Sequence, residues 1–198
     1  MIVLDRNELM NSRMSGSEEA LATMTCERLG VRKTPHILIG GYGMGFTLRA
    51  ALKVLEAKAK ITVVELVPAI VAWARGPMAE LSGDSLTDPR VTIVEGDVVA
   101  AIGKARGSYD AILLDVDNGP EGLTRKSNDA LYDMKGLRAA HAALSPGGVL
   151  AVWSSFPYDK FTALLGKAGF AAEEIKIRAT GTRGGARHVI WLATKPKP

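Results

Sequence analysis

The segment HILIGGYGMGFTL, residues 36–48, determines the predicted fold because it joins an apolar run to a glycine-rich turn and then to a helix. The run at residues 37–39 has the character of a buried strand. A strand, a glycine turn and a helix in this order bring backbone N–H groups and the positive end of a helix dipole to one point. This favours a nucleotide or nucleoside site, although a plain tight turn shows the same spacing. The helix is indicated by apolar residues at i, i+3, i+4 and i+7: Leu48, Ala51, Leu52 and Leu55.

The turn contains Gly41, Gly43 and Gly45, which can adopt positive φ and let a ligand approach the backbone closely. A second apolar run, residues 61–64, follows and ends on Glu65. A carboxylate at the tip of the second strand, about 20 residues past the glycines, is placed to accept hydrogen bonds from both ribose hydroxyls. The alternative is that Glu65 is an ordinary surface residue at a strand end and that the glycines form a plain turn. Both features would then occur together by chance, so the sequence favours a nucleoside site.

Acidic residues also follow the next two predicted strands. The runs at residues 91–94 and 111–114 are followed by Asp97 and Asp115. The turn has the spacing G-x-G-x-G and lacks the extra spacer of the dinucleotide motif G-x-G-x-x-G. The pattern therefore resembles that of class I S-adenosylmethionine (AdoMet) transferases more than that of NAD enzymes. In that class the acid after the second strand holds the ribose and the acid after the third contacts the adenine amine, which implies these roles for Glu65 and Asp97.

The remaining pattern predicts an α/β chain of five βα units followed by a C-terminal hairpin. We expect a Rossmann-like, class I AdoMet-dependent methyltransferase fold with a mostly parallel seven-stranded sheet and a C-terminal antiparallel hairpin. Residues 1–30 are expected to form an N-terminal stub and a helix that packs on the core, and residues 31–198 the AdoMet-type transferase domain. The later elements are expected at residues 133–144 and 157–168 for helices, and at 149–153, 174–179 and 188–193 for strands.

Local signals locate several helix ends. Ser15 and Glu18 match the capping box S-x-x-E, which predicts a helix from there to about residue 29. Pro68 suits the first turn of a further helix. Asp97 and Asp133 are expected to cap the helices that follow them.

Composition and charge narrow the class of protein. The 198 residues are 47% hydrophobic and 23% charged, which suits one soluble domain. No apolar run approaches the roughly 20 residues that cross a membrane, and no basic-then-apolar leader is seen, so we expect a cytoplasmic protein. The net charge is +4, but aromatic residues do not interleave with the basic ones, so we do not expect a nucleic-acid partner. Cys26, the one cysteine, is expected to be an inert packed thiol.

Longer segments resemble the spermidine synthase family, the polyamine aminopropyltransferases, over residues 36–155. The turn DPRV before the tip E-G-D, and the acidic tip after Y-D-x-I-x-x-D, are the more specific features. The family binds decarboxylated AdoMet and transfers its aminopropyl group to the nitrogen of a diamine. The resemblance rests on ILIGGYGMGFTLRAAL, VVEL, LSGDSLTDPRVTIVEGD, YDAILLDVDNGP and LYDMKGLRAAHAALSPGGVLAV.

The resemblance also implies roles for individual residues. Asp115 matches the aspartate that assists deprotonation of the attacking amine, and Asp117, with Asn118 beside it, matches an acid that anchors the cationic substrate. Where the family has a Tyr-His-Glu segment that contributes to the polyamine site, this chain has Gly16-Ser17-Glu18, of which only Glu18 matches. The chemistry is consistent, because an ammonium must lose a proton before it attacks the carbon of a sulfonium, and a nearby carboxylate can take that proton. The donor site is assigned to Gly40, Gly41, Tyr42, Gly43, Gly45, Glu65, Leu66, Asp97 and Val98.

Besides the Tyr-His-Glu segment, the sequence departs from the family at three places. The glycine turn carries Tyr42 and Met44 and lacks the family's aspartate, and the acidic loop at residues 115–118 is shorter than the family's D-S-x-D-P. The N-terminal β domain of the family corresponds to residues 1–14 at most. These departures leave the identity of the donor and of the acceptor open.

Four hypotheses follow. The first is a transferase that alkylates a small amine, with an aminopropyl group by resemblance. The second is an AdoMet-dependent methyltransferase of a small molecule. An acid in the glycine turn would repel the carboxylate of intact AdoMet, and the turn of this chain has no acid. The third is a nucleoside-binding protein without turnover, and a nucleic-acid methyltransferase is a minor fourth. We expect AdoMet or decarboxylated AdoMet as co-substrate, no metal, a small amine as partner, and a homodimer as one assembly to consider.

Overall fold

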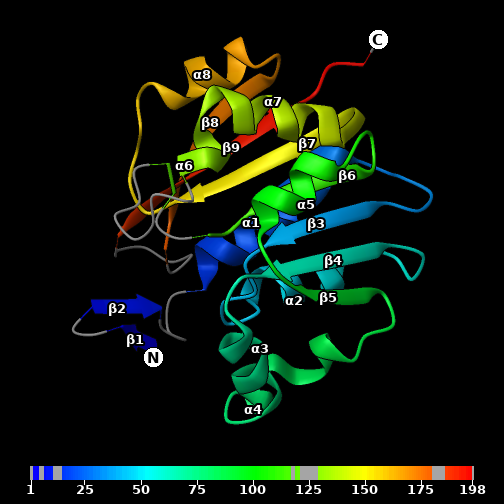
Figure 1. Ribbon diagram of the computed structural model, residues 1–198, viewed down its shortest axis with the longest axis vertical. Helices are drawn as coiled ribbons and strands as arrows, with labels where there is room; N and C mark the ends of the chain where they lie inside the picture. Colours follow the sequence, from blue (N-terminus) through cyan, green and yellow to red (C-terminus); the bar gives the residue numbers. More distant parts are fainter. Residues whose placement is uncertain are drawn as a thin grey trace.

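The computed structural model describes residues 2–4, 7–10, 15–116, 119–120, 129–179 and 186–197. A seven-stranded sheet runs through the molecule with the strand order β5-β4-β3-β6-β7-β9-β8 (Figure 1). Its strands are β3 (His36–Gly40), β4 (Lys60–Glu65), β5 (Val91–Glu95), β6 (Tyr109–Leu114), β7 (Leu144–Ser154), β8 (Ala171–Arg178) and β9 (Arg187–Thr194).

The pairing of the strands confirms the predicted fold class. Strands β5, β4, β3, β6 and β7 pair in parallel, whereas β9 runs antiparallel to both β7 and β8. This is the order and direction of a class I methyltransferase-like α/β sheet with an antiparallel C-terminal hairpin. A separate pair, β1 (Ile2–Leu4) and β2 (Asn7–Met10), forms an antiparallel hairpin near the N-terminus.

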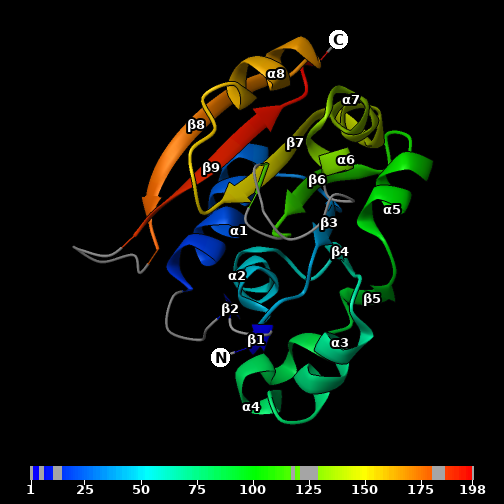
Figure 2. The same cartoon turned by 60° about the vertical axis from the view of Figure 1, so that its left-hand side comes forward.

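Helices cover both faces of the sheet (Figure 2). One face packs against α1, α2 and α3, and the other against α5, α6, α7 and α8. Alternation along β3 explains the two cores, because Ile37 and Ile39 join the first and Leu38 the second. No helix within the described ranges is long and apolar enough to cross a membrane. The helices are α1 (Gly16–Leu29), α2 (Phe46–Val54), α3 (Pro68–Arg75), α4 (Ala79–Ser82), the 3₁₀ turn η1 (Gly83–Leu86), α5 (Val98–Lys104), α6 (Asp129–Tyr132), α7 (Met134–Ala143) and α8 (Phe161–Lys167).

Several predicted helix starts are confirmed, and one is wrong in its mechanism. Asp97 accepts a hydrogen bond from the N–H of Val99, and Asp133 caps α7 in the same way. Ser15 is the N-cap of α1, but its side chain makes no capping hydrogen bond, so the capping box with Glu18 does not form. The S-x-x-E pattern is purely local, and it cannot detect that Glu18 lies beside a carboxylate from another element.

Two of the differences between the expected and observed element boundaries have a local explanation. Helix α8 begins at Phe161, because hydrogen bonds from the N–H of Phe156 to Ser154 Oγ and from the N–H of Phe161 to the carbonyl of Tyr158 form turns before it. The turn at residues 145–148 lies inside β7, where the register with β6 shifts between Tyr109 and Ala111. The extra residues bulge out while pairing resumes at Val149.

Packing of α1 on the sheet can be tested at Leu21, which is fully buried among side chains of α2 and the central strands. We expect Leu21→Ala to lower the free energy of unfolding by about 2–5 kcal/mol, because it deletes buried methyl groups and leaves a cavity. Lys53→Ala, at an exposed position of α2, should change it by less than about 0.5 kcal/mol. Equal denaturation midpoints for Leu21→Ala and the wild type would contradict this packing.

Candidate functional site

The parallel strands bring the predicted site residues to one edge of the sheet. The carboxyl ends of β3, β4, β5 and β6 lie on the same side, as the arrowheads of β3 and β4 indicate in Figure 1. The strand pairing extends into the loops, because the N–H of Gly41 bonds the carbonyl of Val64 at 2.9 Å and the N–H of Asp115 bonds the carbonyl of Gly40 at 3.1 Å. The glycine turn is therefore held between the ends of β4 and β6.

The glycine turn presents backbone and buries its side chains. Gly41 has φ 86°, and a Cβ there would lie 2.5 Å from the backbone oxygen of Asp115, so only glycine fits this close approach. Gly43 has φ 55°, and the N–H of Gly45 closes the turn on the carbonyl of Tyr42 at 2.8 Å. Tyr42 and Met44 are 3% and 5% exposed. Their side chains belong to the interior, and the turn offers a ligand its peptide groups.

Glu65 is buried and held by two backbone donors. Its Oε2 accepts a hydrogen bond from the N–H of Tyr42 and its Oε1 accepts one from the N–H of Val67, both at 2.8 Å. These bonds compensate the burial of the carboxylate and fix its direction relative to the glycine turn. A carboxylate oxygen can accept more than one hydrogen bond, so both oxygens keep capacity for ribose hydroxyls.

The other residues assigned to the donor lie around Glu65 along the same edge. Asp97 is exposed, and its Oδ1 accepts a hydrogen bond from the N–H of Val99 at 2.8 Å, which orients the carboxylate at the start of α5. Leu66 is 43% exposed, whereas Val98 is buried against Gly40, where a Cβ would lie 3.0 Å from Val98 Cγ2. Leu66 thus offers apolar surface at the carboxyl edge of the sheet, and Val98 packs against Gly40, at the start of the glycine turn. Their contacts with a donor stay predictions.

Asp115 follows β6 and meets residues of α1 and α2. Its Oδ2 accepts a hydrogen bond from Thr47 Oγ1 at 2.7 Å. The same hydroxyl, on a side chain only 2% exposed, lies 3.3 Å from the backbone oxygen of Glu18. Thr47 lies in the first turn of α2, so its hydroxyl links three elements at one point. The sequence analysis did not select Thr47, because a threonine in a helix carries no signal of a partner on a distant strand.

Glu18 brings a second carboxyl group to this point. Its Oε2 is buried and has no hydrogen-bond partner among the described residues. Burial raises the pKa of Glu18, and the charge of Asp115 raises it further, although the backbone N–H of Glu18 itself lowers it. Burial also raises the pKa of Asp115, whereas the hydrogen bond from Thr47 lowers it. Asp115 is therefore the more readily ionised member, and Glu18 holds a proton more readily.

Two of the residues assigned to substrate binding, Asp117 and Asn118, lie outside the described residues. Within the part of the chain that is described, no group of three or more His, Cys, Asp or Glu side chains could hold a metal ion. The described site therefore consists of a glycine turn, two acids on the donor side, and the carboxyl pair Glu18 and Asp115.

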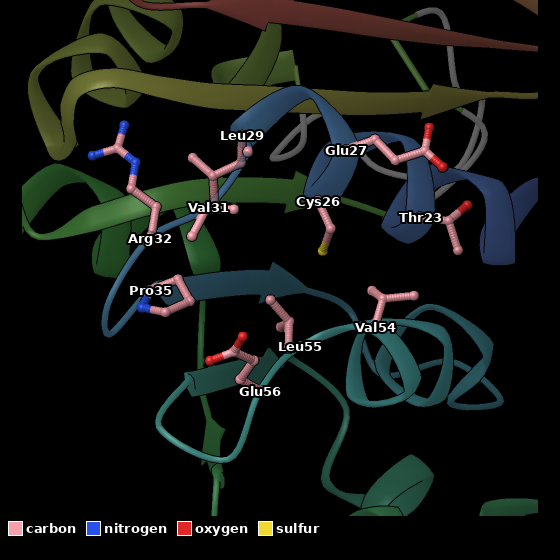
Figure 3. A pocket seen from close by; sticks show the side chains of 11 residues that line it. Thr23, Cys26, Glu27, Leu29, Val31, Arg32, Pro35, Val54, Leu55 and Glu56 are labelled. Atoms are coloured by element: carbon pink, nitrogen blue, oxygen red, sulfur yellow. The ribbon is translucent and has the colours of Figure 1, made fainter.

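A separate hollow lies at the opposite end of the sheet, between the C-terminal ends of α1 and α2 (Figure 3). Its volume is about 390 Å³, and Cys26, Leu29, Pro35 and Val54 contribute to its lining. Burial, and secondarily the charge of Glu27, raises the pKa of the Cys26 thiol to about 11. The thiol is therefore protonated at neutral pH, and this hollow is distinct from the edge that carries the acids.

The role of Glu65 can be tested with 5′-methylthioadenosine, a nucleoside probe without a charged tail. We expect Glu65→Ala to weaken its binding about tenfold or more, because hydrogen bonds to a charged acceptor contribute roughly 1.5–3 kcal/mol. Glu95→Ala is a matched control, since Glu95 is exposed at the end of β5 directly opposite Glu65. Calorimetric titrations that give one affinity for both variants and the wild type would remove Glu65 from the site.

The glycine turn can be tested at Gly43 with a control glycine of equal φ. Gly43 and Gly107 both have φ 55°, so valine at either position should cost a similar amount of stability. We expect Gly43→Val to abolish binding of 5′-methylthioadenosine in a folded protein, and Gly107→Val, in an exposed turn, to bind as the wild type does. Normal binding by Gly43→Val would mean that the segment is only a turn.

Solved structures share the fold at low identity. The crystal structure of spermidine synthase from Thermotoga maritima superposes with a TM-score of 0.71 at 21% identity, covering 93% of this chain and 60% of that chain. A putative O-methyltransferase from Klebsiella pneumoniae gives a TM-score of 0.62 at 18% identity, over 90% of this chain and 80% of that one. These similarities support the fold and do not by themselves indicate an activity.

Comparison of amino-acid sequences is more informative about the family than the comparison of folds. Polyamine aminopropyltransferase 1 from Streptomyces coelicolor is 32% identical over 153 residues, which cover 72% of this chain and 28% of that protein. Putrescine N-methyltransferase 4 from Nicotiana tabacum is 36% identical over 115 residues, 58% of this chain and 28% of that protein. The chain thus spans less than a third of the length of either relative. Residues 16–158 match the family model of the spermine/spermidine synthase domain, and this chain belongs to that family.

Proposed function

We propose that this chain transfers an alkyl group from an AdoMet-type sulfonium donor to a nitrogen of a small amine. The first candidate is transfer of the aminopropyl group of decarboxylated AdoMet. The observation that carries the proposal is the position of Asp115, which Thr47 orients at the carboxyl edge beside the glycine turn. An acid in this place is next to a nucleoside site and beside a second carboxyl group, that of Glu18.

The donor-side residues fit a nucleoside with a charged tail. Glu65 has a fixed direction and spare acceptor capacity for the ribose hydroxyls, and Asp97 has a second oxygen for the adenine amine. The positive φ of Gly43 and the buried side chains of Tyr42 and Met44 leave the peptide groups of the turn open to close approach. The donor, when bound, supplies a carbon activated by a sulfonium.

Asp115 is proposed to prepare the acceptor. An alkylamine is an ammonium at neutral pH, and its nitrogen has no lone pair until a proton leaves. Asp115 takes that proton through a direct hydrogen bond. The lone pair then forms the new C–N bond, the C–S bond breaks, and its electrons neutralise the sulfur as a thioether. Asp117 is proposed to anchor the cationic acceptor, as the family resemblance implies, and Asn118 beside it is proposed to contribute to the same binding.

The relatives support a polyamine-related acceptor. The relatives from Streptomyces coelicolor and Sulfolobus acidocaldarius are named polyamine aminopropyltransferases, the second being 29% identical over 65% of this chain and 42% of its own length. The tobacco relative is named for N-methylation of putrescine. Both names describe alkylation of the nitrogen of an aliphatic amine, so we propose that class of acceptor here.

An N-methyltransferase is the second candidate. Its support is the tobacco putrescine N-methyltransferase together with a glycine turn whose side chains, Tyr42 and Met44, are uncharged and buried. A turn without an acid does not repel the carboxylate of intact AdoMet. A nucleoside-binding protein without turnover is a third candidate, and the carboxyl pair at Asp115 counts against it.

The Asp115→Asn variant tests whether the chain is an enzyme or a binding protein without turnover. The variant keeps an oxygen for the hydrogen bond from Thr47 but lacks the base. We expect the rate of thioether-nucleoside formation to fall about 10²–10⁴-fold, the usual contribution of positioned acid–base groups, with little change in 5′-methylthioadenosine affinity. The assay supplies 1,4-diaminobutane and other small amines with either AdoMet or decarboxylated AdoMet.

The matched control is Asp133→Asn, which alters an exposed acid and preserves the cap of α7, so the wild-type rate should persist. Product with intact AdoMet alone would select the methyltransferase candidate. A wild type that forms no more product than Asp115→Asn, with any acceptor and either donor, would select the non-catalytic one.

A further inference from the structure

We propose that Thr47 is a positioning residue for the proposed transfer, and that its hydroxyl changes partner during the reaction. While Asp115 is ionised, the hydroxyl donates to Asp115 and fixes the direction of the carboxylate. After Asp115 has taken the proton of the amine, the hydroxyl turns to the backbone oxygen of Glu18. The inference rests on the proposed function and deepens it, because it assigns the residue that controls the proposed base.

The first observation is that one hydroxyl lies within reach of two acceptors. Thr47 Oγ1 is 2.7 Å from Asp115 Oδ2 and 3.3 Å from the backbone oxygen of Glu18. A hydroxyl has a single proton, so it donates fully to one acceptor at a time. The shorter distance and the charge of an ionised carboxylate favour donation to Asp115 in the free protein. The backbone oxygen of Glu18 is then the second position of the same hydroxyl.

The second observation is the direction of the Thr47 side chain, which differs from that of other helical threonines in this protein. Thr23 and Thr25 of α1 donate to carbonyl oxygens of their own helix, as threonines in helices commonly do. Thr47 instead connects α2 with Asp115 after β6 and with α1. The side chain is only 2% exposed, so protein packing holds the hydroxyl between its two acceptors. Its contacts therefore serve the proposed base and not its own helix.

The second acceptor matters because the proposed base has to gain a proton. Donation by Thr47 stabilises the ionised form of Asp115, which makes the carboxylate a weaker base. When Asp115 becomes a neutral acid, it attracts the hydroxyl less strongly. Without a second acceptor, a buried hydroxyl would then lose most of its hydrogen bonding, and this loss would oppose proton transfer. The backbone oxygen of Glu18 removes that penalty.

The exchange of partners needs no further reactant. The proton that leaves the acceptor nitrogen stays on Asp115, and the lone pair left on nitrogen forms the C–N bond of the proposed function. Thr47 keeps its own proton and only rotates about its Cβ–Oγ1 bond. Its oxygen can then accept a hydrogen bond from the neutral carboxyl group while its proton is donated to Glu18. Asp115 thus stays oriented in both of its protonation states.

The first test compares the steady-state kinetics of Thr47→Val and Thr47→Ser, using the amine and donor that give product with the wild type. Valine removes the hydroxyl at similar volume, whereas serine keeps it. We expect Thr47→Val to lower kcat about 10–100-fold, the rate equivalent of a hydrogen bond to a charged group, with little change in KM for the amine. Thr47→Ser should keep kcat within about threefold, because its hydroxyl reaches the same acceptors. The affinity for 5′-methylthioadenosine should be the same in both variants.

The matched control is Thr25→Val, which also removes the hydroxyl of a fully buried helical threonine. The hydroxyl of Thr25 donates to the backbone oxygen of Leu21 within α1, so its loss should lower the melting temperature and leave kcat at the wild-type value. If Thr47 acted only through stability, kcat would instead follow the melting temperature across all three variants.

The second test detects the exchange of partners by NMR, from the carbonyl carbon of residue 18, whose resonance moves downfield when its oxygen accepts a hydrogen bond. Glu18 is the titratable side chain that faces Asp115 from α1, and Glu19 lies beside it. The measurement therefore uses Glu18→Gln, which keeps the backbone oxygen and removes the side-chain titration. We expect the resonance to move downfield as the pH is lowered through the titration of Asp115. Addition of Thr47→Val should abolish this movement, whereas any effect of Glu19 would persist.

Wild-type kcat in Thr47→Val, or equal losses of kcat in Thr47→Val and Thr47→Ser, would overturn the positioning role. An identical response of the residue 18 carbonyl with and without Thr47→Val would overturn the exchange of partners. Failure of the proposed function is a different result, namely no product from the wild type with any amine and either donor. The NMR measurement needs no turnover, so it still tests the exchange in that case.

Discussion

The close approach of β3 and β6 at Gly41 is the constraint on which the site depends. The position of a Cβ on Gly41 lies 2.5 Å from the backbone oxygen of Asp115, and the next hydrogen bond of the ladder joins Asp115 to Gly40. Any larger residue would separate the glycine turn from the end of β6. Because these strands are neighbours in a parallel sheet, the turn proposed to receive a nucleoside and the acid proposed to act on an amine are positioned by the same backbone contact.

The site contains buried carboxyl groups that are stabilised in opposite ways. Glu65 receives one backbone N–H on each oxygen, from Tyr42 and Val67, so its burial is compensated within the protein. Glu18 has an oxygen without a partner and an acidic neighbour, Asp115. The first arrangement is preorganised for neutral hydroxyl donors. The second is incomplete until a cation or a proton is present.

The family includes relatives named for two different alkyl transfers, and the fold explains how both are compatible with it. The new bond in either reaction forms between an amine nitrogen and a carbon attached to a sulfonium. The groups around the sulfonium tail decide which alkyl group is transferred, whereas the nucleoside contacts can stay the same. In this chain the uncharged glycine turn and the acidic pair, Glu18 with Asp115, come from different elements. The charges of the side chains around the sulfonium tail are therefore the feature that bears on the identity of the donor.

The sequence by itself determined the sheet, most element positions and the edge at which the acids meet. Apolar runs ending on glycine or acidic residues specify parallel strands, and parallel strands necessarily place Glu65, Asp97 and Asp115 at one edge. The caps at Asp97 and Asp133 were predictable for the same reason, since each depends on neighbours within a few residues.

Only the tertiary structure decided how α1 and α2 complete the site. The local pattern at Ser15 and Glu18 predicted a capping box, which was wrong because Glu18 lies instead beside Asp115. Thr47 carried no local signal, since its hydrogen bond is to a residue that follows a different strand. Contacts between residues distant in sequence depend on how helices pack against the sheet, and a periodic pattern of apolar residues indicates the buried face of a helix without indicating its partner.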